Sequence, residues 1–593
     1  MARSLTLTMA LLAGCAPSVE DGLAGHTDGS TAMADKPIVS LDVSPAMAAL
    51  TTTGTAVTQP FVATAHYADG TTGDVTGSCA WSVSDPAMGA VDGTGHYVSP
   101  ADHGGQADVV AATGGATGKA KLTLKWVATR VSQDDGSTAP ADSSQKFGGA
   151  TTAPLAPSVL YPLDGALVPQ NLGELEVQWQ RAAGTDLFEV ALTAPYLDLR
   201  IYTNAALGRA SLLAKEWASV AASALGDTVT ITVRAVAGAA PGGVGASNTV
   251  KLGIGRDAVQ GGIYYWASTA AGGSVEGIQR HAFGDTTGNA TPFYTETDGN
   301  ARYGGSNHCV ACHALSRDGK KFAITYDGGG GPAAILDVAT KVAMTPQTGL
   351  FWNFATFNPD GTKLLTAQAG QLKILDAAAA PGTLLSTVNI APATYATHPD
   401  WSADGKQIAY VTPSAPLEDW HFDGGSIVVS TDAGGGVFGG PRVLVAAQGG
   451  ENNYYPSFSP DGKWVLFNRS KGDAYDDPDA ETYVASTDGA IAPIKLAAAD
   501  GTGDHTNSWP RWSPFVQHGG PHGDLFYFTF SSKRDYGVEI AGKNQPQIWM
   551  AAFDPSTAQA GGDPSSAPFW LPFQDPATNN HIAQWTETIV AVQ

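Results

Sequence analysis

The chain has few positively charged residues and no long apolar run beyond its first residues, and each shortage excludes a class of protein. Only 32 of its 593 residues are Lys or Arg, against 55 Asp or Glu, which gives a formal net charge of −23. Such an acidic surface repels phosphate backbones, so nucleic acid is not an expected partner. No later apolar stretch is long enough to span a bilayer, so we expect any membrane attachment to come from the N-terminus.

The sequence also lacks the short motifs of several enzyme classes. It contains no G-x-S-x-G nucleophile turn, no HExxH zinc motif and no phosphate-binding P-loop, which leaves open whether the protein is an enzyme. It is rich instead in Gly (71) and Pro (36), with 43% hydrophobic and 15% charged residues. This composition is typical of a turn-rich all-β protein, and the length predicts several domains.

The N-terminus, "MARSLTLTMALLAGCAPS", has one early cation, a short apolar run and then Leu-Ala-Gly-Cys. The run is too short for a membrane span and reads as an export signal over residues 1–14. The final four residues resemble the lipobox of bacterial lipoproteins. The resemblance implies cleavage before Cys15, lipidation of its thiol, a flexible tether over residues 15–36 and, because Ala16 and not Asp follows, an outer-membrane location. The alternative is an ordinary cleaved signal with an incidental cysteine.

Two series of short alternating strands follow, each interrupted by Gly, Pro and Asp turns. This pattern predicts two β-sandwiches. The first, residues 37–127, resembles bacterial Ig-like domains, with Cys79 in its core. The second, residues 155–254, resembles fibronectin-III-like modules, with Trp179 buried. Residues 128–154 are rich in Ser, Thr, Ala and Asp and predict a linker. We expect both sandwiches to be spacers rather than active sites.

The remaining part of the chain, residues 255–593, is repetitive, and its repeats predict its fold. Four segments share an apolar residue, a polar Asp-Gly turn and an apolar strand, and a fifth shares their beginning. They are "CHALSRDGKKFAIT" from Cys312, "FATFNPDGTKLLTA" from Phe354, "HPDWSADGKQIAYV" from His398, "YPSFSPDGKWVLFN" from Tyr455 and "WPRWSPF" from Trp509. Asp-Gly favours a hairpin because Gly adopts positive φ and Asp bonds its own turn. The spacing suits one four-stranded propeller blade per repeat.

The two ends of this region complete a sixth blade. Residues 261–284 have the pattern of later blade strands without a first strand, and residues 581–592, "HIAQWTETIVAV", have the pattern of that missing strand, with Trp585 in the bulky position. Joining them closes the ring and removes a free sheet edge. The "SPDGK" and "FSSKRD" segments resemble the propeller of TolB-like proteins. The resemblance implies an all-β fold with a six-bladed propeller closed by its C-terminal strand, but no particular function.

The segment Cys309-Val-Ala-Cys312-His313 has the CxxCH spacing of covalent haem attachment. The repeat alignment places it on the rim of the propeller's channel. Its resemblance to c-type cytochromes implies thioethers from both cysteines and ligation of the haem iron by His313. The helical fold and downstream Met ligand of cytochromes are missing, so a sixth ligand would have to come from a neighbouring blade; a five-coordinate haem open to a small ligand is the equal alternative. His398 is best placed as the sixth ligand; weaker candidates are His308, His421 and His505.

Two other interpretations of this segment remain open. Cys309 and Cys312 could form a loop disulfide, since export permits disulfides. Alternatively His308, Cys309, Cys312 and His313 could bind zinc, although adjacent ligands strain one tetrahedral centre. The leading functional prediction is a haem c protein for electron transfer or small-ligand redox chemistry, with an unidentified redox partner. The rival is a non-enzymatic, TolB-like module that binds an envelope protein or polymer.

The lipobox interpretation can be tested directly. We expect Cys15→Ala to move the protein from the membrane fraction to the soluble fraction, because the lipid on this thiol is the only anchor that the sequence predicts. Fractionation followed by a high-salt wash measures this. A variant that stays with the membrane after the wash would contradict the prediction.

Overall fold

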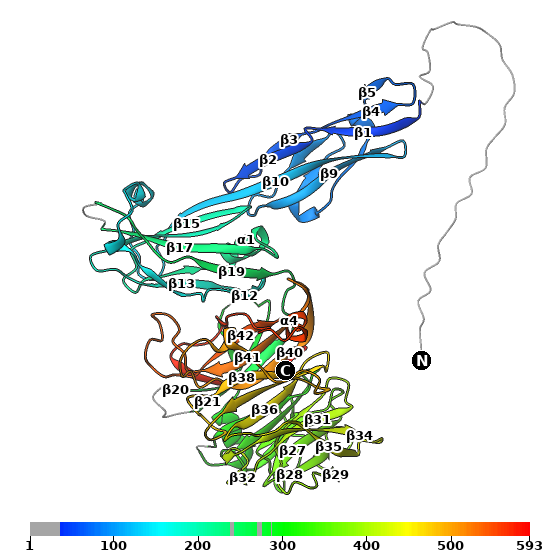
Figure 1. The fold of residues 1–593 in the computed structure, drawn as a ribbon, viewed down its shortest axis with the longest axis vertical. Helices are drawn as coiled ribbons and strands as arrows, with labels where there is room; N and C mark the ends of the chain where they lie inside the picture. The colour runs from blue at the N-terminus through cyan, green and yellow to red at the C-terminus, as the bar shows by residue number, and fades with distance from the viewer. Residues whose placement is uncertain (1–35, 238–241, 270–274, 286–287, 307, 593) are drawn as a thin grey trace, which may run out of the picture.

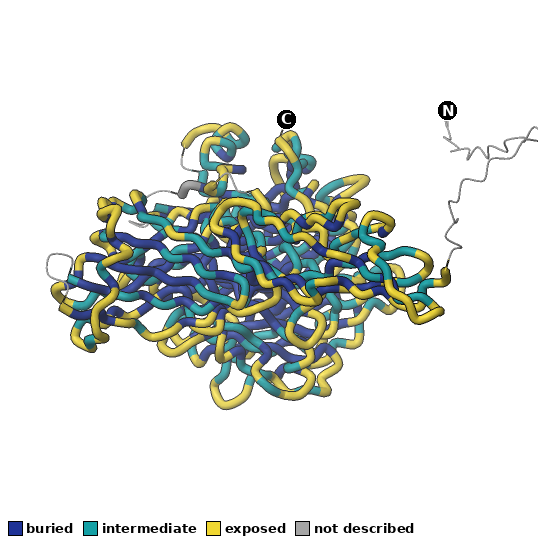
Figure 2. The backbone as a smooth tube through the Cα atoms, turned by 90° about the horizontal axis from the view of Figure 1, so that it is seen from above, coloured by how far each residue is buried: buried dark blue, intermediate teal, exposed yellow. Residues whose placement is uncertain are grey.

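The computed structural model is an all-β protein of three parts, arranged along its longest axis (Figure 1). Two β-sandwiches lead into a propeller, and buried strands alternate with exposed loops throughout (Figure 2). Among the described residues, no helix has the length and apolarity that crossing a membrane requires. The residues outside the description are 1–35, 238–241, 270–274, 286–287, 307 and 593. The expected signal peptide and Cys15 lie among these residues.

The first sandwich forms because its strands alternate between core and solvent. In β1 (Ile38–Ser44), Leu41 and Val43 are buried while Asp42 between them is exposed. Cys79 is 8% exposed and lies in this core, as predicted. The other strands are β2 (Met47–Thr52), β3 (Thr58–Pro60), β4 (Val62–Tyr67), β5 (Thr72–Asp74), β6 (Ala80–Val83), β7 (Ala90–Val91), β8 (His96–Val98) and β9 (Gly105–Thr113), with short 3-10 turns η1 (Thr76–Ser78) and η2 (Pro86–Met88).

The next strand, β10 (Ala116–Val131), passes through the predicted boundary at residue 127 and joins the two sandwiches. Its first part pairs with β9 and β2, whereas its last six residues pair in parallel with β15 (Leu197–Thr203) of the second sandwich. One ten-stranded sheet therefore spans both sandwiches. The first four residues of the predicted linker, residues 128–131, belong to this strand, and Phe147 further along the linker is buried against the second sandwich.

The second sandwich packs a short sheet against the far end of the long one, with Trp179 fully buried between them, as predicted. Helix α1 (Ala214–Ser223) lies beside this core. The remaining elements are β11 (Ser158–Tyr161), β12 (Ala166–Pro169), β13 (Leu175–Gln180), β14 (Leu187–Ala194), β16 (Arg209–Leu212), β17 (Thr228–Val236), β18 (Gly245–Ala246) and β19 (Val250–Gly255), with 3-10 turns η3 (Ser143–Phe147) and η4 (Ala153–Leu155) before them.

The propeller has six blades, as the repeats predict. From the channel outwards, blade one consists of β44 (Thr578–Thr586), β20 (Gly262–Thr269), β21 (Val275–Ala282) and β22 (Thr291–Tyr294), and blade two of β23 (Val310–Leu315), β24 (Lys321–Tyr326) and β25 (Ala333–Asp337). Blade three consists of β26 (Phe354–Phe357), β27 (Lys363–Gln368), β28 (Gln371–Asp376) and β29 (Leu384–Thr387), and blade four of β30 (Thr397–Trp401), β31 (Gln407–Thr412), β34 (Ser426–Asp432) and β35 (Phe438–Val445). Blade five consists of β36 (Asn452–Phe458), β37 (Trp464–Ser470), β38 (Glu481–Ser486) and β39 (Ile494–Lys495), and blade six of β40 (Ser508–Gly520), β41 (Gly523–Ser532), β42 (Gln547–Phe553) and β43 (Phe569–Trp570). Shorter elements are α2 (Glu296–Tyr303), the hairpin β32 (Ala415–Pro416) and β33 (Phe422–Asp423), α3 (Ala497–Asp500) and α4 (Pro555–Gln559).

The C-terminal strand closes the ring, which confirms the split blade. Strand β44 pairs antiparallel with β20, with Trp585 opposite Ile263. The Asp-Gly turns also have the predicted chemistry: in blade four, Ser402 donates to Asp404 over 2.8 Å, and Gly405 has φ of +75°. Blades two, three and five repeat this arrangement. The aspartates of the repeat are thus turn residues.

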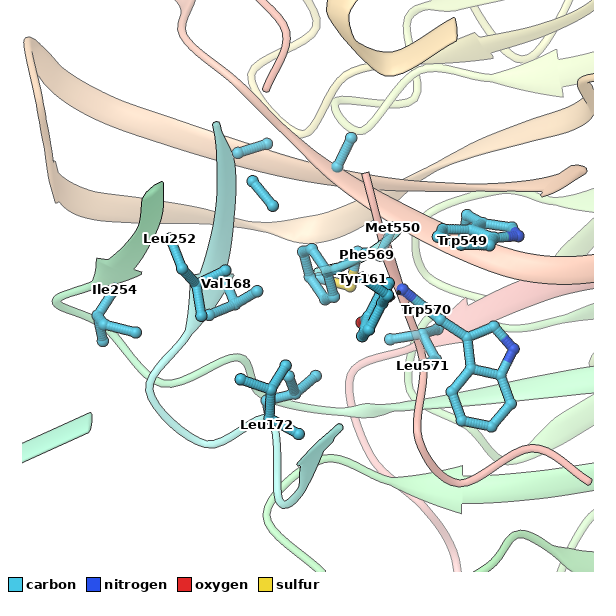
Figure 3. Close-up of a cluster of buried hydrophobic side chains, with 14 of the residues drawn as sticks. Tyr161, Val168, Leu172, Leu252, Ile254, Trp549, Met550, Phe569, Trp570 and Leu571 are labelled. Atoms are coloured by element: carbon cyan, nitrogen blue, oxygen red, sulfur yellow. Dashed lines mark hydrogen bonds between the residues drawn. The ribbon is translucent and has the colours of Figure 1, made fainter. Parts of the chain in front are cut away.

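The second sandwich and blade six share a single hydrophobic core, which corrects the expectation of an independent spacer (Figure 3). The ring of Tyr161 lies 4.8 Å from that of Tyr536, which stacks on Trp570 at 4.2 Å. Val168 and Leu252 of the sandwich belong to the same cluster. Blade six has apolar side chains on its outer strands because they pack against another domain instead of water.

Polar groups at this junction are paired across it. Arg209 forms an ion pair with Glu539, and the Tyr536 hydroxyl donates to Glu176 over 3.0 Å. Gln178 accepts from the backbone N–H of Val538 over 2.9 Å. Burial raises the pKa of the Glu176 carboxyl despite the neighbouring Arg209. Buried polar groups with partners on both sides fix the orientation of the two parts.

The shared core predicts that a sandwich mutation destabilises the propeller. We expect Tyr161→Ala to lower the stability of the propeller by about 3 kcal/mol, because it leaves a cavity between Tyr536 and Trp549. Differential scanning calorimetry measures this. Tyr97→Ala is the matched control, since Tyr97 is equally buried but lies in the first sandwich. A propeller transition that Tyr161→Ala leaves unchanged would rule out the coupling.

Candidate functional site

The inner strands of five blades carry the same backbone irregularity at the channel. In each, a β-bulge near the start of the strand places one residue at positive φ. The side chains next to this residue therefore point in other directions than they would in a regular strand. Strand β26 of blade three has a regular register instead. The bulged residues are Cys312 (φ +40°), His398 (+48°), Tyr455 (+52°), Trp509 (+54°) and Ile582 (+57°). Cys312 therefore occupies the predicted position, at the channel mouth where the inner strands begin.

Aromatic rings from four consecutive blades fill the channel at this mouth. His398 and Tyr455 stack at 4.2 Å, and Tyr455 and Trp509 stack at 4.1 Å. The edge of Phe354 packs against His398 at 4.3 Å. All four side chains are at most 9% exposed. This aromatic plug, defined as Phe354, His398, Tyr455 and Trp509, closes the channel on the side of the CxxCH segment.

Cys309 and Cys312 are both free thiols at this mouth. Burial raises the pKa of the Cys312 thiol to about 11, and the pKa of Cys309 is also raised, mainly by burial. The side chain of Thr325 in β24 lies next to the Cys312 thiol and opposes part of the rise in its pKa. On the same side of the propeller, Tyr475 and His581 line a cavity of about 560 Å³, which neither cysteine lines.

His313 points away from the thiols, into the contact between blades one and two. It is 4% exposed, and its ring stacks on Phe322 at 5.6 Å. Its Nε2 lies 3.3 Å from the carbonyl oxygen of Tyr264 and therefore carries a proton to donate, whereas its buried Nδ1 has no partner among the described residues. Burial lowers the pKa of His313 to about 4. Its Nε2 is thus not available to an iron in this arrangement.

His398 lies at the channel, two blades from Cys312. Its ring, however, has the opposite tautomer to that of a histidine that binds haem iron through Nε2. Its Nδ1 accepts from the backbone N–H of Tyr455 over 3.3 Å. The neutral ring then carries its proton on Nε2, which is buried without a described partner. Burial lowers the pKa of His398 well below its ordinary value. As placed, therefore, His313 and His398 do not fit the predicted role of axial ligands to one iron.

The weaker histidine candidates are dispersed around the rim. His308 contacts Asp327 through Nδ1 at 3.0 Å and the Gly304 carbonyl through Nε2. His421 pairs with Asp473, and burial lowers the pKa of His505. In the described part of the chain, no group of three or more His, Cys, Asp or Glu side chains is placed to hold a metal ion. The zinc interpretation therefore has no assembled site.

Other side chains at this mouth were not predicted from the sequence, among them His581, whose ring lies 6.4 Å from that of Trp509 in the plug. Tyr455 and His581 each have a buried polar atom, the hydroxyl and Nδ1, without a described partner. Burial lowers the pKa of His581 to about 4. The repeat alignment already placed Tyr455 in the column of Cys312, and His581 directly precedes that column in blade one. Tyr475 lies in an irregular loop, where the repeats give no position.

Comparisons with known proteins agree with the propeller fold. No protein-family model matches the chain, and no curated protein matches it in sequence. Similar solved structures include TolB from Acinetobacter baumannii (13% identity, TM-score 0.36, covering 60% of this chain and 79% of that one) and a TolB-type protein from Agrobacterium tumefaciens (17%, 0.29, 56% and 99%). Hydrazine synthase from Kuenenia stuttgartiensis is also similar (13%, 0.30, 48% and 76%). With identities of 17% or less and TM-scores below 0.5, these likenesses carry no argument about what this chain binds or does.

The raised pKa of Cys312 predicts slow alkylation. In a Cys79→Ser, Cys309→Ser chain made without haem, iodoacetamide at pH 8 should modify Cys312 about a hundredfold more slowly than in the same chain unfolded, because the thiolate fraction is smaller. Between pH 8 and 10 the rate should rise about tenfold per pH unit. Mass spectrometry of timed samples measures both. Equal rates for the folded and unfolded chain at pH 8 would contradict the placement of this thiol.

Proposed function

We propose that this chain is an exported, lipid-anchored envelope protein whose propeller carries a covalently attached haem at Cys309 and Cys312. The observation that supports it is the position of both thiols. They are free, and they lie three positions apart at the channel mouth, where Cys312 occupies the bulge of its inner strand. A haem bound there would supply one-electron or small-ligand redox chemistry at its iron.

The residues of the CxxCH segment fit covalent attachment of a haem through the two thiols better than they fit ligation of its iron by a histidine. Thioether formation needs two reduced thiols at CxxC spacing, and Cys309 and Cys312 are both free. The histidine of the motif is enclosed between Phe322 and the Tyr264 carbonyl. The proposal therefore covers attachment through the thiols and assigns no protein ligand to the iron. At the same mouth, the aromatic plug supplies an apolar wall that closes this end of the channel.

A second candidate function is supported by exposed apolar side chains on the same side of the propeller. Leu417 is 81% exposed, Phe351 51% and Tyr475 50%, and all three lie in loops around the mouth where the inner strands begin. Isolated exposed apolar residues are common, but a group around a closed channel favours docking of a protein or polymer. In this case the propeller is a non-enzymatic binding module in which Cys309 and Cys312 remain thiols or form a disulfide.

The mass of the intact mature protein distinguishes these functions. In a bacterial host with a cytochrome c maturation system, we expect one added haem that survives acid–organic extraction, together with a Soret band. Cys309→Ser with Cys312→Ser should lose both signals, whereas Cys79→Ser, which changes a buried thiol far from the mouth, should keep them. A colourless protein of unmodified mass would reject the haem and leave the binding module. A mass two hydrogens lower would indicate the disulfide.

A further inference from the structure

The channel has a second, polar end on the side of the Asp-Gly turns, below the aromatic plug. Here the third residue of each repeat faces the lumen. These residues are Ala314, Thr356, Asp400, Ser457, Arg511 and Gln584. All but the alanine line a cavity of about 140 Å³. This lumen belongs neither to the CxxCH segment nor to the cavity of about 560 Å³.

The Arg511 guanidinium lies in this lumen with few partners. Its Nη1 donates to the carbonyl oxygens of Pro456 and Pro510 over long distances of 3.3 and 3.4 Å. No described residue accepts a hydrogen bond from its Nε or Nη2. Burial lowers the pKa of Arg511, but an arginine remains charged at any ordinary pH. Guanidinium donors that the protein leaves unused are available to a bound anion, and hydrogen bonds between two charged groups are among the stronger ones.

Asp400 lines the same cavity from blade four, two blades from Arg511. Its Oδ2 accepts from the backbone N–H of Phe458 over 2.7 Å. Burial raises the pKa of this carboxyl, and the nearby Arg511 opposes the rise. Among the described residues, the two side chains do not form an ion pair with each other. They therefore present opposite charges to one small space instead of neutralising each other directly.

We propose that this lumen binds a small zwitterion, an α-amino acid of about the size of glycine. Its carboxylate would meet the two unused donors of Arg511, and its ammonium would meet Asp400, while Thr356, Ser457 and Gln584 offer further polar atoms. A plain anion would be repelled by Asp400, and a plain cation by Arg511. The cavity of about 140 Å³ is large enough to hold a ligand of this size.

Isothermal titration of the mature full chain with glycine, acetate and methylammonium tests this inference. We expect glycine to bind at least tenfold more tightly than acetate or methylammonium, because only glycine satisfies both charges. Equal or tighter binding of acetate would overturn the zwitterion and indicate a simple anion site. No heat with any of the three ligands would overturn the site itself. Neither outcome depends on whether haem is attached, because the aromatic plug lies between the two sites.

Two substitutions sharpen the test by removing one charge each. Arg511→Gln should weaken glycine binding at least tenfold. Asp400→Asn should weaken glycine binding but strengthen acetate binding, because it removes the repulsion of the anion. Asp404→Asn is the matched control and should change neither, since Asp404 is an exposed turn residue four positions along the chain. Circular dichroism confirms that each variant is folded. Unchanged acetate affinity in folded Asp400→Asn would contradict the opposed-charge arrangement.

Discussion

The pairing of β44 with β20 is the constraint on which the propeller depends. It joins the last strand of the chain to the first complete strand of the propeller, so six sheets form a closed ring instead of an open row. A closed ring has no free inner edge, and all inner strands then begin at one mouth and end at the other. Both candidate sites follow from this arrangement, because residues far apart in the chain reach one channel only when the ring is closed.

Along that channel, position within the repeat decides chemistry. The first residue of each repeat lies at the channel mouth, at a bulge in every blade but the third, and four such residues are aromatic rings that pack into the plug. The third residue faces the lumen below and is polar in five of the six blades. A single repeated strand therefore produces an apolar closure at one end and a charged cavity at the other. The two ends of the channel differ only in which side chains the repeat places there, since the backbone is nearly the same in each blade.

The sequence was informative wherever a local pattern repeats, and less so wherever distant segments meet. The Asp-Gly turns, the six blades and the closure by Trp585 were all predictable, because each depends on residues within one short strand or turn. The enclosure of His313 was not, because the bulge at Cys312 changes the side to which its neighbour points. The core around Tyr161 and Trp570 was also hidden, since these residues lie 409 positions apart and neither belongs to a motif.

The same junctions have a mechanical consequence. Strand β10 holds the second sandwich through six parallel residue pairs with β15, and that sandwich is joined to blade six by a common core. A pull between residue 36 and the propeller would load the β10–β15 hydrogen bonds in shear, so that they would have to break together and not one after another. A force applied to the N-terminal end would reach the propeller as torque on blade six. Load on the N-terminal end and the packing of blade six are thereby linked.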